Sequence, residues 1–556
     1  MKNLSQYQAL YSEYRWLVPT RFNVADVCCR RWATSAADTR RIAIYTEDAQ
    51  GARDIWTFER LFQTANRLSH GLARMGVRPG DRVAVLLGPG GEAAAAHMGI
   101  YQLGAVCVPL SPALAPEALE WRLRDCEARV AILGEAAQPS LAAILHRCPA
   151  LTQLIGVGFA DERTLAWRSL LARQEDEFTP VDTLATDPAL LLYTGGTTGA
   201  PKGVLHAHAS LIGALPGFVA AHDWFPHAGD SIWTPADWSW SPGLFGGLLP
   251  ALYFARPVLA VQGRIGAERA FDVLARYRIT NALIAPALLR AMMRVDPPPA
   301  PPPLLRSLVT TGEPLDPAVL AWAESRLGVL PNEVYGQSEA HLLIGNSRHK
   351  WPVRPGSMGL AFPGHQVAVI DEAGQCLPPG EIGELAVHRR DVEGDDDPAL
   401  MLGYWRGEAA TAARFTQDWW RTGDLARQDD EGYFWYEGRA DDVFRVGEHR
   451  IGPGSIESWL RRHPAVANAV IVPKPDDSAG AIVKAYVVLT EPYIGQAPSY
   501  LLETLQTHAR ERLAPYEHPG EIEFVDNLPM TSAGTVQRNV LRQRERDRAA
   551  RRRARP

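Results

Sequence analysis

The sequence predicts an α/β protein in which a large N-terminal domain precedes a small α+β domain. Apolar segments alternate with amphipathic helical segments over the first half of the chain. From about Gly364 the strands become shorter and turn signals separate them, and the pattern changes again after 438–442. A chain of 556 residues is also too long for one ordinary core, so at least two domains are expected.

The first half has the rhythm of a parallel sheet with helices on both faces, because strands and helices alternate. The expected strands are Arg82–Leu87, Val106–Leu110 and Val130–Leu133, and the expected helices are Glu92–Leu103 and Trp121–Cys126. A similar rhythm returns in Glu268–Tyr277 (helix), Ala282–Ile284 (strand), Leu288–Arg294 (helix) and Ser307–Thr310 (strand). We therefore expect two doubly wound α/β subdomains.

A β-rich third subdomain is expected to complete the large domain. Its predicted strands are Val367–Asp371, Gly383–Val387 and Gly432–Glu437. Two segments of the large domain have unusual composition. Pro297–Pro303 predicts an extended surface spacer, and Asp391–Pro398 predicts a solvated acidic loop.

The large domain is expected to end at residue 438, because its last strand ends there. Residues 439–442 are the predicted hinge, 443–556 the small C-terminal domain, and 542–556 its basic tail. The predicted elements of the small domain are Ser455–His463 and Ser499–Leu513 (helices) and Val466–Val472, Ile482–Leu489 and Glu521–Val525 (strands).

Composition excludes several classes of protein. The net charge of -6 argues against a polyanion-binding chain, so no nucleic acid is expected as a partner. Eight arginines in Arg542–Pro556 predict a solvated helix end and frayed tail, with contact to nucleic acid or an anionic membrane as the alternative. We expect no disulfide framework from the six cysteines, and no leader, because the segment Met1–Trp16 is polar and mixed in charge. We also expect no membrane span, because no apolar run reaches about 18 residues. We expect a soluble, cytoplasmic protein.

The segment Leu191–Val204 carries the strongest chemical signal. It reads LLYTGGTTGAPKGV, an apolar strand that runs into a loop of glycines and threonines followed by Lys202. Small residues let backbone N–H groups approach phosphate, hydroxyls add donors, and the lysine adds a cation. The spacing is not that of a Walker A loop. Alone, the loop is compatible with either a flexible turn or a polyphosphate site.

The loop resembles the Y-T-S-G-T-T-G-x-P-K-G-V segment of the adenylate-forming (AMP-binding) enzymes, with Gly195 where serine is usual. Further matches follow in the expected order: Thr311–Pro314 (TGEP), Glu333–Glu339 (EVYGQSE), Arg421–Asp424 (RTGD), Gly438–Asp442 (GRADD) and Arg450–Pro453 (RIGP). The resemblance covers roughly residues 30–545 and favours the acyl-CoA synthetase branch, of the short- and medium-chain type. It also implies that the small domain is mobile, with a hinge at Asp441.

The resemblance assigns roles residue by residue. Nucleotide contacts are implied for Thr194, Gly195, Gly196, Thr197, Thr198, Gly199, Gly312, Glu313, Pro314, Glu333, Tyr335, Gly336, Asp424 and Arg439. Catalytic positions are implied at Lys202, Ser338, Glu339, Arg450 and Thr535. Tyr335 would stack on adenine, Glu333 and the 312–314 backbone would read the adenine edge, and Asp424 would bind the ribose hydroxyls. Glu339 and Thr197 would hold Mg²⁺.

The implied reaction has two steps and uses ATP, Mg²⁺ and CoA. A carboxylate attacks the α-phosphate to give acyl-AMP and pyrophosphate, and a thiol then attacks the acyl carbon after the small domain has rotated. Trp238, Trp240 and Phe245 lie where the family gates its acid pocket, although ordinary aromatic core is an equal alternative. Gly336 replaces the tryptophan of acetate-specialised relatives, so we expect a monocarboxylic acid larger than acetate.

Two departures weaken the resemblance in the small domain. Leu528–Arg538 reads LPMTSAGTVQR, with Thr535 where relatives have a lysine that reaches the α-phosphate. Gly447 and Glu448 take the places of the serine and glycine that border the path of CoA. Three functions stay open: an acyl-CoA synthetase, an adenylate-forming enzyme with another acceptor, and a weakly active nucleotide- or acyl-adenylate-binding protein. A homodimer is possible.

Overall fold

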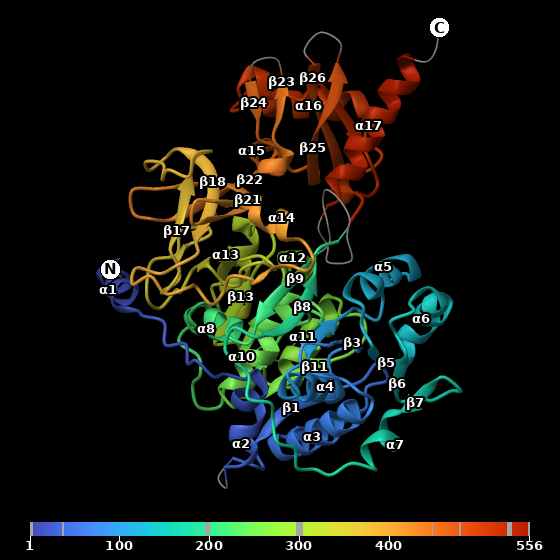
Figure 1. The fold of residues 1–556 in the computed structure, drawn as a ribbon. Coiled ribbons are helices and arrows are strands. Elements are labelled where there is room, and N and C mark those ends of the chain that lie inside the picture. The colour runs from blue at the N-terminus through green and yellow to red at the C-terminus, as the bar shows by residue number, and fades with distance from the viewer. Residues whose placement is uncertain are drawn as a thin grey trace. The chain divides into compact units, whose positions relative to one another are not determined.

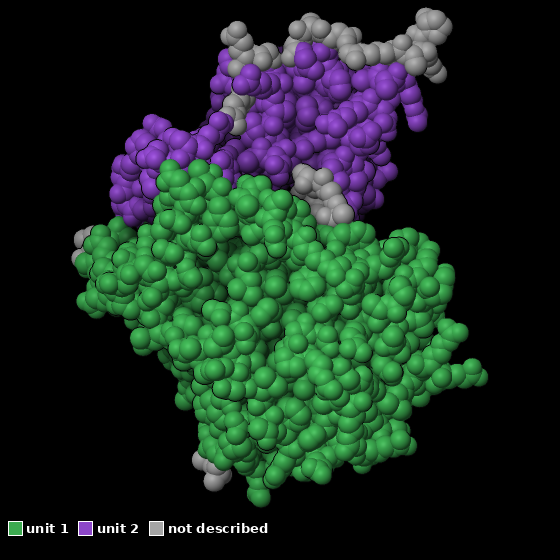
Figure 2. Space-filling view, viewed as in Figure 1, with its two compact units in different colours: residues 1–194, 201–367, 387–420 green, residues 195–200, 368–386, 421–556 purple. Residues whose placement is uncertain are grey.

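The computed structural model describes residues 4–35, 38–194, 201–295, 304–446, 449–476, 480–530 and 536–553. The chain forms two compact units, which Figure 2 colours separately. Within the described ranges, the first unit comprises residues up to 194, 201–367 and 387–420, and the second comprises 368–386 and 421–553. The domain boundary expected at residue 438 falls inside the second unit.

One sheet of the first unit has the strand order β19–β9–β8–β4–β3–β5–β6–β7 (Figure 1). The strands are β3 (Arg82–Leu86), β4 (Val106–Pro109), β5 (Val130–Gly134), β6 (Gln153–Val157), β7 (Thr164–Ala166), β8 (Pro188–Tyr193), β9 (Gly203–Ala207) and β19 (Gly403–Tyr404). Strands β4, β3, β5 and β6 pair in parallel, whereas β9 is antiparallel to both β8 and β19.

Alternate residues of β3 face opposite sides of this sheet, as the period of a strand requires. Val83 and Val85 pack in an apolar cluster with helix α4 (Gly91–Gln102), and Ala84 and Leu86 pack in another with α5 (Pro116–Cys126). Helices therefore cover both faces, and the first doubly wound subdomain is confirmed.

A second sheet has the order β16–β15–β14–β13–β12–β10–β11–β1–β2. Its strands are β1 (Ile42–Glu47), β2 (Arg53–Thr57), β10 (Ile232–Trp233), β11 (Val258–Val261), β12 (Asn281–Leu283), β13 (Ser307–Thr310), β14 (Asn332–Tyr335), β15 (Ile344–Gly345) and β16 (Leu360–Ala361). Each neighbouring pair in the series β1, β11, β10, β12, β13 and β14 is parallel. One face packs with α11 (Ala267–Arg276), α12 (Pro286–Met293) and α13 (Pro317–Leu327), and the other shares its apolar cluster with the first sheet.

The other helices of the first unit are α1 (Leu4–Glu13), α2 (Arg31–Ala33), α3 (Phe58–Arg74), α6 (Gln138–Ile144), α7 (Trp167–Leu171), α8 (Ser210–Ala221), α9 (Ser241–Gly243), α10 (Leu249–Tyr253) and α14 (Glu408–Ala412). Local sequence sets several of their ends. Thr57 caps α3 by accepting from the backbone N–H of Arg60, and Asp316 caps α13 by accepting from Ala318. Gly328 ends α13 with φ 69°, a conformation that suits glycine.

The β-rich part forms a third sheet of order β17–β18–β21–β20, with β22 paired to β21. The strands are β17 (Val367–Ile370), β18 (Ile382–His388), β20 (Phe415–Thr416), β21 (Trp419–Gln428) and β22 (Phe434–Arg439). The pairs of β21 with β20 and with β22 are antiparallel, as the turn-separated short strands predict.

The rest of the second unit has the expected α+β character. A hairpin, β23 (Phe444–Val446) and β24 (His449–Ile451), precedes a sheet of β25 (Val466–Asp476), β26 (Gly480–Leu489) and β27 (Glu521–Phe524). Helices α15 (Pro453–Leu460) and α16 (Pro498–Arg510) share an apolar cluster with these strands, and α17 (Arg538–Arg553) is the last element.

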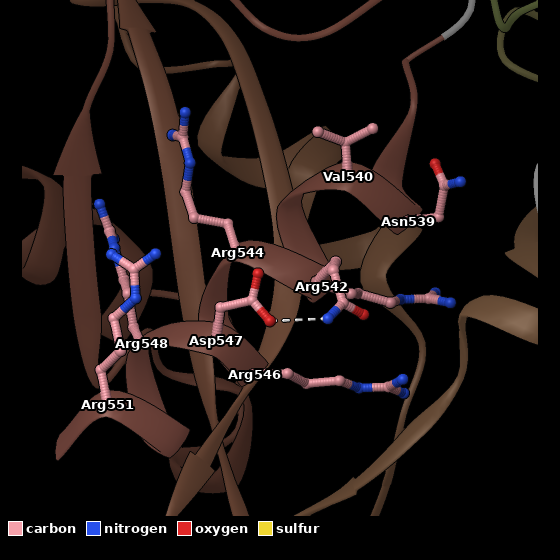
Figure 3. A pocket seen from close by; sticks show the side chains of 9 residues that line it. Asn539, Val540, Arg542, Arg544, Arg546, Asp547, Arg548 and Arg551 are labelled. Atoms are coloured by element: carbon pink, nitrogen blue, oxygen red, sulfur yellow. Dashed lines mark hydrogen bonds between the residues drawn. The ribbon is translucent and has the colours of Figure 1, made fainter. Parts of the chain in front are cut away.

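Helix α17 is solvated over most of its surface, as expected, but it differs from a frayed end because one of its sides is bound to the sheet. Arg548 Nη1 lies 2.6 Å from Glu523 Oε2 and 2.8 Å from Glu545 Oε1. Glu545 is 1% exposed and also lies 2.9 Å from the buried Lys484 Nζ. This network binds the helix to β26 and β27. Figure 3 shows side chains of α17 that line a pocket; of these, Arg544, Arg546 and Arg551 have no ion-pair partner among the described residues.

The acidic loop 391–398 is only partly solvated, which also differs from expectation. Asp391 is buried because its carboxylate caps the turn, accepting from the N–H groups of Glu393 and Asp395. Asp397 is buried as well and lies 2.7 Å from His365 Nδ1. Of the proline-rich spacer, residues 297–303 lie outside the described part of the chain.

Candidate functional site

The glycine- and threonine-rich loop joins two antiparallel strands of the first unit. Strand β8 ends at Tyr193, β9 begins at Gly203, and the backbone N–H of Thr194 donates to the carbonyl of Lys202 at 3.0 Å. Gly195, Gly196, Thr197, Thr198 and Gly199 lie outside the described residues. The ammonium of Lys202 lies 4.7 Å from the centroid of the Tyr404 ring, a cation–π distance.

Tyr404 also contacts the predicted metal ligand. Its hydroxyl donates to Glu339 Oε1 at 2.8 Å, and the backbone N–H of Met401 donates to the carbonyl of Glu339 at 2.8 Å. Burial, together with the nearby charge of Glu339, raises the pKa of Tyr404 above its ordinary value. The hydroxyl therefore stays protonated and remains a donor. Lys202 and Glu339, far apart in sequence, are thus brought to one tyrosine.

Ser338 is held through its backbone by a buried histidine that sequence reasoning missed. His206 Nε2 lies 2.7 Å from the carbonyl oxygen of Ser338, and because a carbonyl only accepts, Nε2 carries the hydrogen. Burial lowers the pKa of His206 to about 4, so the ring is neutral at pH 7. Its position in the sequence could have indicated this role. Val204 and His206 are alternate residues of β9, directly after the loop, and both side chains are buried.

Glu333 is a buried carboxyl next to the turn that contains Gly312. Its Oε1 accepts from the backbone N–H of Leu315 at 2.9 Å, and Oε2 is buried with no hydrogen bond to any described residue. Burial raises the pKa of Glu333 to about 7. Gly312 adopts φ 101°, which favours glycine, and exposed Glu313 forms an ion pair with Arg290.

The predicted neighbours of Glu333 differ in exposure. Pro314 follows Glu313 and is exposed, whereas the Tyr335 ring is half-buried at the end of β14. The carbonyl of Tyr335 accepts from the backbone N–H of Leu343 at 2.9 Å. The structure therefore places Glu333 and Tyr335 on one strand, and the 312–315 turn against that strand.

The aromatic residues predicted to line the acid pocket are mostly buried. Trp238 and Phe245 are 2% exposed, and Trp240 is half-buried. Phe245 lies in a π-helical turn, Leu244–Leu248, of the kind that often marks functional sites. It stacks on His341 with ring centroids 3.8 Å apart and an interplanar angle of 21°.

His341 was also missed from sequence. Its Nδ1 lies 2.7 Å from Ser241 Oγ, and its ring lies 4.5 Å from that of His206. Burial, with the neighbouring His206, lowers the pKa of His341 well below its ordinary value. The buried cluster of Phe245, His206 and His341 is therefore aromatic and uncharged near neutral pH.

Gly336 has a packing reason beyond pocket volume. A Cβ built there would lie 2.6 Å from the backbone nitrogen of Leu342 and 3.1 Å from the carbonyl oxygen of Ala340. Any side chain would force the 340–342 backbone to move. An effect of Gly336 on the size of the acid stays a prediction.

In the second unit the two predicted ribose-binding residues form a pair. Asp424 and Arg439 lie opposite each other in β21 and β22, and Arg439 Nη1 is 3.0 Å from Asp424 Oδ1. Asp424 is 4% exposed, and its N–H donates to the hydroxyl of Thr422 at 3.1 Å. The strand pairing thus sets the orientation of both side chains.

The predicted hinge lies directly after this pair. Asp441 is exposed, while Asp442 Oδ2 lies 2.8 Å from Arg538 Nη1 and its other oxygen pairs with Arg542. Arg542 also donates to the carbonyl of Asp441 at 3.1 Å. Asp442 is thereby tied to helix α17.

The two departures from the family pattern fall on residues that the structure does not describe. These are Gly447, Glu448 and Thr535. The backbone of Arg450 is described and lies opposite Arg445 in the hairpin of β23 and β24. The catalytic role of Arg450 and the roles at 447, 448 and 535 stay predictions.

Comparison with known proteins places this geometry in context. Residues 30–405 match the family described as AMP-binding enzyme, and residues 455–535 match the AMP-binding enzyme C-terminal domain. The chain belongs to the AMP-binding enzyme family. The resemblance predicted from the ordered motifs is therefore confirmed.

The similarity to individual proteins covers nearly the whole chain. An uncharacterized acyl-CoA ligase of Bacillus subtilis (strain 168), YtcI, is 33% identical over 95% of this chain and 97% of its own length. The anthranilate CoA ligase AuaEII, solved with anthranoyl-AMP, has a TM-score of 0.83 at 29% identity, covering 96% of this chain and 99% of its own. A benzoate CoA ligase from Burkholderia xenovorans LB400 has a TM-score of 0.80 at 27% identity, covering 94% and 100%.

For this AMP-binding enzyme, Glu339 suits Mg²⁺. It is a hard oxygen ligand whose Oε1 is fixed by Tyr404 and whose Oε2 makes no hydrogen bond within the described ranges. Thr197, the second expected ligand, lies outside them. No group of three or more histidine, cysteine or acidic side chains able to hold a metal occurs in the described part.

Proposed function

We propose that this AMP-binding enzyme activates a monocarboxylic acid with ATP and transfers the acyl group to CoA. The observation that carries the proposal is the convergence of Lys202 and Glu339 on Tyr404 at the base of the loop. A cation and a carboxylate at this point match what a metal–triphosphate complex needs. The acyl-CoA ligase names of the relatives support the same reaction.

In the first step, a carboxylate oxygen of the acid attacks the α-phosphorus. The bond between the α-phosphorus and the oxygen that bridges it to the β-phosphorus breaks. Acyl-AMP forms and pyrophosphate leaves. In the second step, the CoA sulfur attacks the acyl carbon, AMP leaves, and the thiol proton passes to solvent. The chain contributes positioning and charge: Lys202 near the phosphates and Ser338 near the α-phosphate.

Glu339 and Thr197 would hold Mg²⁺, which offsets the charge of the triphosphate. In the second unit, the Asp424–Arg439 pair would bind the ribose hydroxyls. Glu333 would accept from the adenine amino group, with Tyr335 against the ring. Arg450 and the hinge at Asp441 belong to the change of conformation between the two steps.

The acid is expected to be larger than acetate, either aliphatic or aryl. The Phe245–His341 stack is aromatic and flat, and the neutral states of His206 and His341 place no positive charge there to pair with a second substrate charge. These features favour a monocarboxylate. The anthranilate and benzoate ligases among the similar structures support testing aryl acids first.

The test is acid-dependent exchange of labelled pyrophosphate into ATP, run from acetate to decanoate and on benzoate and anthranilate. We expect exchange with at least one acid larger than acetate, and loss of exchange in Lys202→Ala. Lys350→Ala is the matched control, because Lys350 also lies over an aromatic ring, that of Trp224 at 4.4 Å. The absence of exchange with every acid would refute the proposal.

CoA as acceptor is tested separately with supplied acyl-AMP. Thioester formation supports the synthetase function, whereas transfer to an amine, a carrier thiol or water alone would support the alternative acceptors. Activation at only trace rates would support the weakly active binding protein, because Thr535 replaces the expected lysine.

We also propose a cytoplasmic location and participation in fatty or aryl acid metabolism. All six cysteines are free, and only Cys376 among them is exposed, which fits a reducing compartment. Among the described helices, none combines the length and apolar character that crossing a membrane requires. Fractionation of cells tests the location, and size-exclusion chromatography with light scattering tests the possible homodimer.

A further inference from the structure

The short strand β19 lies outside the motifs named above, and it connects the motif that contains Lys202 with the motif that contains Glu339. In β19, Tyr404 lies opposite Val204 of β9, and the N–H of Trp405 donates to the carbonyl of Gly203 at 2.7 Å. Three residues before Tyr404, Met401 donates to the carbonyl of Glu339. The backbone of 401–405 is therefore bonded both to the end of the loop and to the Glu339 turn.

The side chain of Tyr404 continues this connection. It is 7% exposed, its hydroxyl donates to Glu339 Oε1, and its ring face lies under the Lys202 ammonium. The backbone N–H of Tyr404 donates to Thr411 Oγ1 at 2.9 Å, and that hydroxyl donates to Gly407. Tyr404 is thus held from several sides before it contacts either charged group.

This arrangement has a consequence for both charged groups. A hydrogen bond to Oε1 restricts the rotamers of Glu339 and turns Oε2 into the oxygen available to a metal. Hydrogen bonds to charged groups are about twice as strong as neutral ones. The ring face attracts the ammonium of Lys202 without neutralising it, so the cation stays available to phosphate.

We propose that Tyr404 is a positioning residue that orients Glu339 for Mg²⁺ and Lys202 for the triphosphate. The inference rests on the proposed function, because it names a residue that acts on the same ATP site. It assigns a specific role to a buried tyrosine that lies outside the motifs identified from sequence.

The test compares Y404F, which removes only the hydroxyl, with Y404L, which also removes the ring. Binding of ATP is measured by calorimetry with Mg²⁺ and with EDTA, and the Mg²⁺ dependence of pyrophosphate exchange is measured in parallel. We expect Y404F to lower the apparent Mg²⁺ affinity about tenfold while changing ATP binding in EDTA less than about twofold. Y404L should add a loss of about two- to fivefold in EDTA.

The matched control is Y277F. Tyr277 also donates to a glutamate, Glu47 Oε2, at 2.7 Å, but in a network without the loop or Glu339. The Y277F substitution should leave ATP binding unchanged both with Mg²⁺ and with EDTA. Because Y404F and Y404L carry the same Mg²⁺ prediction, either variant tests the proposal if the other does not fold.

A double-mutant cycle with E339Q decides whether Tyr404 acts through Glu339. Adding Y404F to E339Q should cause no further loss of Mg²⁺ affinity. A Mg²⁺ affinity of Y404F equal to that of wild type, or full additivity in the cycle, would overturn the inference. Wild type that neither binds ATP nor exchanges pyrophosphate would instead refute the proposed function.

Discussion

Glu333 is a buried carboxyl whose replacement by glutamine should raise the stability of the protein but weaken its use of ATP. Burial raises its pKa from the ordinary value of 4.5 to about 7. The folded state therefore holds the proton more tightly than the unfolded state. The cost of ionising the buried group is absent below 4.5, grows as pH rises from 4.5 to about 7, and is complete above that.

The size of this cost follows from the two values. The difference of 7 − 4.5 is about 2.5, and at about 1.4 kcal/mol for each pKa unit it amounts to about 3 kcal/mol. Glu333→Gln removes an ionisable group that is 7% exposed. Calorimetry should therefore show the variant unfolding at a higher temperature than wild type at pH 8.5, with the difference vanishing towards pH 4.5.

The same substitution, although stabilising, should weaken the binding of ATP. In Glu333→Gln the amide oxygen must accept from the N–H of Leu315, as Glu333 Oε1 does at 2.9 Å, so the amide N–H₂ group takes the place of Oε2. A donor there opposes the amino group of adenine but suits the carbonyl of hypoxanthine. We expect about tenfold to a hundredfold weaker use of ATP, with ITP affected much less. In wild type the KM for ATP should fall as pH rises from 6 to 8.

Glu47→Gln is the matched control for both measurements. Glu47 is also buried, yet although burial raises its pKa, the hydrogen bond from Tyr277 and the charges of Arg276 and Arg269 hold that pKa below its ordinary value. Its stabilising effect is present above 4.5 and is lost as pH falls, so the control should destabilise the protein at pH 8.5. A Glu333→Gln variant that is less stable at pH 8.5 and keeps the ATP preference of wild type would refute the reasoning.

Three further substitutions test other parts of the molecule. Thr535→Lys should raise acid-dependent pyrophosphate exchange by about 10²–10³ and leave thioester formation from supplied acyl-AMP unchanged; no gain would mean that another group already stabilises the transition state. Asp442→Ala should lower the stability of the second unit by about 2 kcal/mol, and its calorimetric midpoint with it, because Arg538 loses one carboxylate 2.8 Å away but keeps Glu457; the exposed Asp430→Ala should not. Gly336→Ala should lower the melting temperature by several degrees, because its Cβ would meet backbone at 2.6 Å, whereas Gly134→Ala, with only an ordinary 3.6 Å contact, should change it little.

Most elements could be predicted from sequence because each depends on its own period of apolar residues. The strand Ser307–Thr310 begins and ends where the pattern places it, and Ala282–Ile284 is shifted by one residue. Helix boundaries differ more where proline begins the helix: Pro116 lies five residues, and Pro453 two residues, before the start that periodicity indicates.

The site was harder to predict because its contacts join distant segments. Nothing near Tyr404 in sequence indicates that its hydroxyl reaches Glu339 or that its ring lies under Lys202. His206 and His341 become informative only when their rings meet in the folded chain. The raised pKa of Glu333 likewise depends on burial, which a single carboxyl in a sequence does not reveal.

The described residues that flank the segment 531–535 are bonded to one another. On either side of 531–535, Met530 pairs with Val536, and the N–H of Gln537 donates to the carbonyl of Pro529 at 2.8 Å. Arg538 then pairs with both Asp442 and the buried Glu457. Similarity to acyl-CoA ligases over nearly the whole chain argues against a protein that only binds nucleotide. We therefore expect an enzyme whose first step is slowed by the absence of a cation at position 535.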